Sequence, residues 1–452
     1  MRGKILKTCA SQLSQIFTTI FQFLVNIHVM PRSWKSSTII PLPKNSKACQ
    51  LNDFRPVALT SIVAKCFESV LCVHLKKDAI DNIIDNVIDP LQFAYKMKRG
   101  VDDACLTLIN LVSKHLQDQN AAVRILMIDF SSAFNSIEPV VLLKRLIDLG
   151  VNSNLILFIN DFLKDRPQRV LTDGKVSDEI VISTGAPQGC VLSPTLFSIY
   201  TDEVRFDNKI TTLFKFADDM ALVGRLKRED DLAAYFCDVQ KLHQWCSKSF
   251  LELNVKKTKE LVFDERPEKP PFEPIKISNE SVEVVDSFKY LGTIIDTNLD
   301  FKENTDQIYK KCQQRLYLLR KLKSFDVCPE ILETVYRSMI ESVLIFNIAC
   351  WYNFLTLQNK KKLDRIVRLA SKIIGWPQVP LVKLYEKCVQ RKGKSIVACE
   401  DHPLFSEFEL LPSKKRYRIQ LSKKKFRKSF VPSAIAVLNS QGREGRHRST
   451  IL

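Results

Sequence analysis

Two adjacent carboxylates interrupt a mostly apolar stretch near the middle of the chain. Residues 213–216 lead into Ala217, Asp218 and Asp219, and the apolar residues 220–223 follow them. This pattern predicts a buried β-hairpin with both acids at its turn. Acids in a buried hairpin need a compensating charge, which a divalent cation supplies for phosphate chemistry. Asp also favours turns through hydrogen bonds to its own backbone, so the pair alone is more typical of a turn than of catalysis.

A third carboxylate follows another apolar segment. Residues 124–128 are typical of a buried strand that delivers Asp129 to a turn. Alone, Asp129 is more typical of a helix cap. Two unit charges 4 Å apart repel by roughly 4 kcal/mol at an effective dielectric near 20, so three clustered acids would be strained without cations.

A glycine-containing loop lies between these acids in the sequence. Gly185 and Gly189 permit close approach of another backbone, and Gln188 offers an amide group. The apolar residues 192–200 predict a helix after the loop. Alone, this segment is simply a loop and a helix start.

The segments that must position these residues are predicted to be a mixture of helices and strands. Helical periodicity covers residues 59–77, 101–116, 140–149 and 153–163, and it alternates with the apolar strands. Residues 13–30 predict an amphipathic helix rather than a signal peptide, because polar side chains interrupt the stretch. Residues 267–274 predict a loop. The first three hundred residues are therefore expected to form one compact α/β unit.

The chain becomes more basic and helical from about Asn304. Long helical patterns rich in Lys and Arg predict a separate helical domain, and prolines are frequent after Gly375. A basic run without acids follows, comprising Lys414, Lys415, Arg416, Arg418, Lys423, Lys424, Lys425, Arg427 and Lys428. This run is typical of an RNA-binding segment, a nuclear import signal or a solvated tail.

Composition limits the partners. The 68 Lys and Arg residues against 50 acids give a net charge of +18, which favours nucleic acid or an acidic membrane surface. The 13 cysteines follow neither a disulfide framework nor zinc spacing, which indicates a reducing, intracellular compartment. No apolar segment is long enough to predict insertion into a membrane.

Together these segments resemble the reverse transcriptase of non-LTR, LINE-type retrotransposons of the jockey-like group. The similar segments, in the family's order, are residues 34–44 with 53–60 for the fingers, 92–95 with 102–104 for the next motif, 129–137, 185–197 and 216–219 for palm motifs A, B and C, 245–261 for motif D and 288–292 for the primer grip. Chance does not readily produce seven such segments in order.

The resemblance implies an α+β fold of the right-hand polymerase type. We expect fingers and a palm with an antiparallel sheet in residues 1–300, a helical thumb in residues 301–375 and a basic C-terminal extension in residues 376–452. Full-length elements of this group carry an endonuclease before the polymerase, so we expect this chain to lack one. Met220 and the pair Gly100-Val101 depart from the family pattern without touching an implied metal ligand.

The resemblance also implies a two-metal site. Asp129 and Asp218 would bridge two Mg²⁺ ions, or Mn²⁺ in their place, about 3.5–4 Å apart. Asp219 would complete the acidic cluster, and the backbone carbonyl of Phe130 is a further ligand. Lys257 would protonate the leaving pyrophosphate, although its neighbouring lysines compete for this role.

The remaining implied site residues bind substrates. The incoming nucleotide would contact Lys44, Arg55, Phe134, Gln188 and Gly189, and the primer grip would comprise Tyr290, Leu291 and Gly292. Phe134, alternatively a core aromatic, would exclude a ribose 2′-hydroxyl and so select deoxynucleotides. The implied partners are an RNA template, a DNA primer and dNTPs, in the nucleus or cytoplasm.

Three functions stay open at this point. The leading hypothesis is an RNA-directed DNA polymerase that extends a DNA primer on an RNA template. An RNA-directed RNA polymerase shares the palm geometry, but Phe134 argues against it. A catalytically inactive, polymerase-derived RNA-binding protein is the third, and the retained Asp129, Asp218 and Asp219 argue against it.

Overall fold

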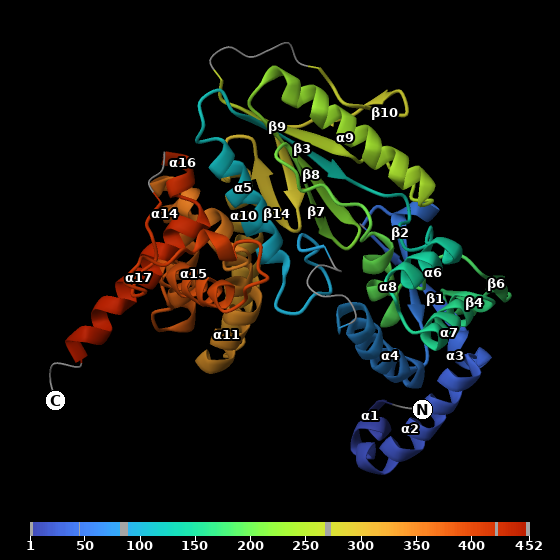
Figure 1. Ribbon diagram of the computed structural model, residues 1–452. Coiled ribbons are helices and arrows are strands. Elements are labelled where there is room, and N and C mark those ends of the chain that lie inside the picture. The colour runs from blue at the N-terminus through green and yellow to red at the C-terminus, as the bar shows by residue number, and fades with distance from the viewer. Residues whose placement is uncertain (1–2, 45, 82–88, 267–272, 421–423, 449–452) are drawn as a thin grey trace. The chain divides into compact units, whose positions relative to one another are not determined.

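The structure is a computed structural model that describes residues 3–44, 46–81, 89–266, 273–420 and 424–448 (Figure 1). The chain forms two compact units, each built from three stretches of sequence. Unit 1 comprises residues 1–95, 130–205 and 240–254, and unit 2 comprises residues 96–129, 206–239 and 255–452. The assignment of fingers, palm, thumb and extension to residues 1–300, 301–375 and 376–452 stays a prediction.

Unit 1 combines helices with a small sheet. Its helices are α1 (Gly3–Thr8), α2 (Ala10–Ile27), α3 (Arg32–Lys35), α4 (Ile62–Asp81), α6 (Pro139–Asp148), α7 (Ser153–Leu163) and α8 (Leu192–Tyr200). Its strands are β1 (Ser37–Pro43), β2 (Phe54–Leu59), β4 (Arg166–Thr172), β5 (Lys175–Val176) and β6 (Ile180–Ile182). The strand order is β2-β1-β4-β5, with β6 also on β4, and β1 runs parallel to β4.

Unit 2 is built on a second sheet with the order β12-β9-β3-β8-β7. Its strands are β3 (Ala122–Ile128), β7 (Thr211–Phe216), β8 (Asp219–Leu226), β9 (Lys259–Asp264) and β12 (Glu283–Val284). The pairs among β7, β8, β3 and β9 are antiparallel, as a palm sheet is expected to be. Two short hairpins accompany it, β10 (Lys276–Ile277) with β11 (Glu280–Ser281) and β13 (Ser287–Tyr290) with β14 (Thr293–Asp296).

Every residue of β3 is buried, which requires cover on both faces of the sheet. Helix α5 (Val101–His115) packs against β7 and β3 (Figure 1). Helix α9 (Glu229–Lys248) contributes Tyr235, whose ring lies so close to Gly224 of β8 that an added Cβ would stand 2.5 Å from it. A side chain at Gly224 would therefore force α9 away from the sheet.

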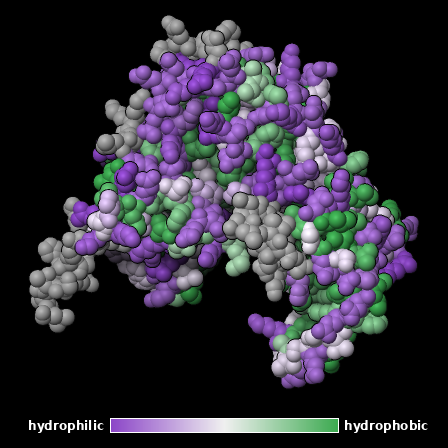
Figure 2. Space-filling model, viewed as in Figure 1, coloured by the Kyte–Doolittle hydropathy of each residue, from purple (hydrophilic) through white to green (hydrophobic). Residues whose placement is uncertain are grey.

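The rest of unit 2 is helical. It comprises α10 (Lys302–Lys323), α11 (Pro329–Val335), α12 (Ser342–Leu344), α13 (Ile348–Trp351), α14 (Leu357–Ile374), α15 (Leu381–Val397), α16 (Lys424–Arg427) and α17 (Phe430–Arg448). Helix α10 packs along α14, and α15 packs along α17. Polar side chains cover much of the face seen in Figure 2, as the charge of the chain requires.

Most predicted helices are confirmed within a few residues, including those at residues 101–116, 140–149, 153–163 and 192–200. The predicted start at residue 59 is wrong, because Leu59 ends β2 and pairs with Thr38 of β1. Within residues 414–428, Phe426 is 1% exposed and α16 packs against α5, so this part is not a solvated tail, whereas Lys414, Lys415 and Arg418 are exposed. Lys423 and most of the predicted loop at 267–274 lie outside the described residues.

Candidate active site

The two adjacent carboxylates lie at the turn between β7 and β8. Phe216 pairs with Asp219, so Ala217 and Asp218 form a two-residue connection. Ala217 has a φ of 56°, and a positive φ at this position suits the twist of a tight hairpin. The strands are buried as predicted, but Asp218 and Asp219 are exposed. The predicted buried hairpin with both acids at its turn is therefore confirmed, and the turn carries the acids beyond the packed part of the sheet.

Strand β3 brings the third carboxylate to the same edge of the sheet. Ile128 pairs with Met220, so the next residue, Asp129, continues toward the β7–β8 turn. Directly opposed residues of antiparallel strands have Cα atoms about 4.5–5.5 Å apart. The register therefore brings Asp129 next to the turn that carries Asp218 and Asp219, over 80 residues later in the chain.

Two residues that follow α9 in sequence contact Asp129. The backbone N–H of Asp129 donates to Oγ1 of the fully buried Thr258 at 3.3 Å. Nζ of Lys257 lies 3.9 Å from Oδ2 of Asp129, and both side chains are well exposed. Lys259 is engaged elsewhere, with Nζ 2.6 Å from both the Lys256 carbonyl and the Glu283 carboxylate. Of the neighbouring lysines, Lys257 is thus the one that the structure pairs with an implied metal ligand.

The predicted primer grip is the turn of the β13–β14 hairpin. Tyr290 pairs with Thr293, and Leu291 and Gly292 between them have φ values of 45° and 88°. Tyr290 is 2% exposed, so its side chain is not available at the surface and only the turn can touch a primer directly. Burial, with smaller contributions from the nearby Cys105 and Asp219, raises the pKa of the Tyr290 hydroxyl well above its usual range.

Unit 1 holds the predicted loop that contains Gly185, Gln188 and Gly189. The backbone N–H of Ala58 in β2 donates to the Gln188 carbonyl at 2.6 Å. Gly189 has a φ of 130°, and a Cβ there would lie 2.4 Å from the Ala58 carbonyl oxygen. A Cβ on Gly185 would lie 2.7 Å from the Asn135 carbonyl oxygen. The predicted close backbone approach is confirmed, and both partners are segments of the protein itself.

Phe134 also belongs to unit 1 and is half-buried. Its ring stacks on that of the buried Phe197 in α8, with centroids 4.8 Å apart. Its carbonyl accepts the Ala186 N–H at 2.8 Å, which ties it to the glycine-containing loop. The side chain is therefore held in place and is still partly accessible.

The two predicted triphosphate-binding cations lie at one corner of the unit 1 sheet. Lys44 directly follows β1, and Arg55 stands in β2 opposite Leu42. Both are exposed, and the Lys44 N–H donates to the Asp53 carbonyl at 2.8 Å. Their placement on paired strands keeps the two backbone positions close.

Sequence reasoning missed two buried charges behind the glycine-containing loop. Nη1 of Arg166 donates to the Gly185 carbonyl at 2.7 Å, and burial lowers the pKa of Arg166 to about 10. Oε2 of Glu68 accepts the N–H groups of Val191 and Leu192 at 2.6 and 2.9 Å, which caps the start of α8. No local motif could have found either residue, because Glu68 lies more than a hundred residues from its partners.

The oxygen donors at the edge of the palm-like sheet suit a hard cation. Within the described ranges, no group of three or more His, Cys, Asp or Glu side chains is already arranged around a metal position. Mg²⁺ is commonly held by one or two carboxylates together with substrate phosphates and water. Asp129, which directly follows β3, and Asp218, in the β7–β8 turn, fit that pattern and could hold the metal.

Comparisons with known proteins show what the chain is similar to. The family model described as "Reverse transcriptase (RNA-dependent DNA polymerase)" matches residues 42–295. A second model, for the N-terminal region of alkylated DNA repair protein alkB homolog 8, matches only residues 302–342. Over the described part of the chain, no helix combines the length and apolar character needed to cross a membrane.

Curated relatives carry related names. The RNA-directed DNA polymerase from the mobile element jockey of Drosophila melanogaster is 23% identical over 82% of this chain and 41% of that protein. The probable RNA-directed DNA polymerase from transposon BS of the same organism is 22% identical over 74% of this chain and 37% of that protein. The chain thus spans about two fifths of the length of these relatives. Apo telomerase from Candida tropicalis aligns over 96% of this chain and 71% of that chain with 12% identity and a TM-score of 0.43, which is too low to support an argument.

Proposed function

Because the chain belongs to the reverse transcriptase (RNA-dependent DNA polymerase) family, we propose that it extends a DNA primer on an RNA template. The relatives named after jockey and transposon BS suggest a non-LTR retrotransposon as its origin. The observation that carries the proposal is the β3–β8 register, which delivers Asp129 to the hairpin turn of Asp218 and Asp219. Two carboxylates at one sheet edge are the donor set that nucleotidyl transfer requires.

Each carboxylate has a distinct proposed role. Asp129 and Asp218 would hold the divalent cations, with the Phe130 carbonyl as a further ligand and Asp219 as an accessory charge. Bound metal would lower the pKa of the primer 3′-hydroxyl and neutralise charge on the triphosphate. Lys257, which lies 3.9 Å from Asp129, would supply a proton to the leaving pyrophosphate.

Substrate selection would use residues of unit 1. Gln188 and Gly189 would contact the incoming nucleotide, and Lys44 and Arg55 would contact its triphosphate. The stacked and partly accessible ring of Phe134 would clash with a ribose 2′-hydroxyl, which favours dNTPs.

Nucleic acid would be held by segments that follow the carboxylates in the sequence. The Leu291–Gly292 turn would contact the primer, and the exposed cations of α10 would contact template–primer phosphates. The basic C-terminal region would add phosphate contacts, and we place the protein in the nucleus or cytoplasm, where RNA templates occur.

The test is primer extension on an RNA template with Mg²⁺ and dNTPs. Asp218→Asn should reduce extension by at least about a hundredfold, because it removes charge that stabilises the reacting phosphates. Asp173→Asn is a matched control, since Asp173 is an exposed aspartate with a φ of 50° at the turn between β4 and β5.

Three outcomes would contradict the proposal. Equal extension by Asp218→Asn and wild type would remove Asp218 from the site. Tight RNA binding by a wild-type protein that extends no primer would favour the catalytically inactive RNA-binding protein. Incorporation of rNTPs in preference to dNTPs would instead favour an RNA-directed RNA polymerase.

A further inference from the structure

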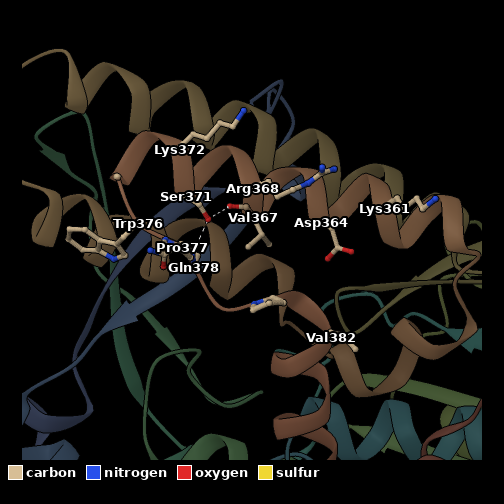
Figure 3. Close-up of a pocket in the computed structure, with 12 residues that line it drawn as sticks. Lys361, Asp364, Val367, Arg368, Ser371, Lys372, Trp376, Pro377, Gln378 and Val382 are labelled. Carbon is tan, nitrogen blue, oxygen red and sulfur yellow. Dashed lines mark hydrogen bonds between the residues drawn. The ribbon is translucent and has the colours of Figure 1, made fainter.

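A groove of about 930 Å³ lies along α14 and the segment that follows it (Figure 3). Helix α14 contributes Lys361, Arg368 and Lys372, and residues 375–380 contribute Trp376 and Gln378. We call this the α14 groove. All of its lining residues belong to unit 2, and none is part of the proposed nucleotidyl-transfer site.

The three cations form a stripe on one face of the helix. Their positions are i, i+7 and i+11, which places them about 10 Å and about 6 Å apart along the helix axis. All three are exposed, and among the residues that the structure describes none of them forms an ion pair. The stripe is therefore available to successive phosphate groups of a nucleic-acid strand.

Neighbouring cations of the same helix are used within the protein. Nζ of Lys362 forms an ion pair with Asp306 and lies 4.8 Å from the centroid of the Tyr309 ring. Nζ of Lys360 lies 4.8 Å from the centroid of the Tyr352 ring. The groove cations thus differ from Lys360 and Lys362, whose positive charges have partners within the protein.

The opposite wall presents an aromatic ring and an amide. Trp376 is half-buried, and Gln378 is 8% exposed. Nε2 of Gln378 has no hydrogen-bond partner among the described residues, although buried amides normally have one. The Gln378 N–H donates to Oγ of Ser371 at 3.0 Å, which fixes this wall against α14 (Figure 3).

One acidic side chain limits the way in which an anion can bind. Asp364 lies on α14 between Lys361 and Arg368 and also lines the groove. Its carboxylate repels a phosphate placed directly above it, and it can accept a hydrogen bond from an N–H group on the edge of a base. Phosphates are therefore favoured near the cations at the two ends, with a base between them.

We propose that the α14 groove binds single-stranded RNA, with an unpaired base stacked on Trp376 and flanking phosphates on Lys361, Arg368 and Lys372. Gln378 donates its amide hydrogen to an acceptor on the edge of that base. A positive groove with an aromatic platform is the usual arrangement for single strands. A paired base cannot offer its face to Trp376, so the site discriminates against duplex.

The affinity of the full chain for fluorescein-labelled oligouridylate, measured by fluorescence anisotropy, tests the proposal. Trp376→Ala should weaken binding about 5- to 150-fold, the range found for loss of one stacked base, whereas Trp376→Phe should retain most of the affinity. Arg368→Ala should lower the slope of log affinity against log salt by about one, because one phosphate contact is lost. Arg368 is exposed, so its truncation leaves the fold intact.

Lys362→Ala is the matched control, because it removes a cation of the same helix whose charge is already paired. It should leave the affinity for oligouridylate within about twofold of wild type. Unchanged binding by both Trp376→Ala and Arg368→Ala would overturn the proposal. So would equal competition by polyglutamate, which would identify the groove as a site for acidic peptides. Primer extension on an RNA template with a short single-stranded overhang should be retained by Trp376→Ala, which separates this site from the proposed polymerase site.

Discussion

Replacing the buried carboxylate of Asp103 is expected to cause a large loss of stability. The carboxylate is 1% exposed and accepts the Gly100 N–H at 2.8 Å and the Nε2–H of His402 at 3.0 Å. Nζ of Lys392 lies 3.1 Å from both of its oxygens. These contacts join the start of α5 to α15 and to the turn that follows it, almost three hundred residues away. Asp103→Asn keeps the shape of the side chain and removes the charge.

The expected magnitude follows from the burial of the group. Removing one partner of a buried ion pair costs about 3–5 kcal/mol when the other charge stays buried without compensation, and we expect the lower part of this range because Lys392 keeps its ion pair with Asp102. Asp102 provides a matched control, since it also pairs with Lys392, at 2.7 Å, with a side chain that is 35% exposed. Asp102→Asn should cost only about 0.2–1 kcal/mol, as solvent screens exposed pairs.

Urea unfolding followed by circular dichroism would compare the two variants, and limited proteolysis would show which segment is released. Asp103→Asn should lower the unfolding midpoint far more than Asp102→Asn and should expose the region around α15 to protease. Equal losses in the two variants would refute the reasoning, because burial would then make no difference. A loss below about 1 kcal/mol for Asp103→Asn would refute it as well.

Three further predictions concern stability. Burial holds the pKa of His402 below its usual range, so the unfolded chain binds more protons than the folded protein as pH decreases below about 6.5. The free energy of unfolding should therefore fall as the pH falls in that range. The variant His402→Asn should flatten the profile of thermal midpoint against pH. Glu260→Gln should lower the free energy of unfolding by about 3–5 kcal/mol in chemical denaturation, since it breaks the buried ion pair with Arg124 at 2.5 Å. Replacing both residues by apolar ones should recover most of that loss. Gly189→Ala should impair folding, measured by soluble yield and unfolding midpoint, because the added Cβ would lie 2.4 Å from a backbone oxygen. Gly174→Ala is the control, because an added Cβ there has no atom within 4 Å. It should show only the cost of its positive φ, about 1–2 kcal/mol.

The carboxylate turn shows how far local sequence can lead. Apolar residues on both sides of Asp218 predict paired, buried strands, and the structure has β7 and β8 there. The exposure of Asp218 itself was not predictable from this pattern, because hydropathy reports the burial of a strand and not the point where packing ends. Residues 102–104 resemble a motif of the family, and the structure adds that Asp103 within it is buried and accepts a hydrogen bond from His402.

The C-terminal region shows the opposite limit. Its basic run suggested an RNA-binding segment, a targeting signal or a tail, and charge alone gave no reason to choose among them. Phe426 and Phe430 are buried, which anchors the region in unit 2. These two side chains lie in a strongly basic stretch, so the apolar signal was too sparse to predict a packed helix.

The sequence by itself determined the family, most helices and the apolar strands that end in Asp129 and Asp218, because hydrophobic periodicity and motif spacing are local properties of the chain. Only the tertiary structure decided that Thr258 and Lys257 flank Asp129, that Arg166 and Glu68 hold the glycine-containing loop, and that His402 contacts Asp103. Such contacts join residues 18 to 299 positions apart in the sequence. Their free energy depends on which faces are packed together and shielded from water, and local patterns in a single sequence do not encode that choice.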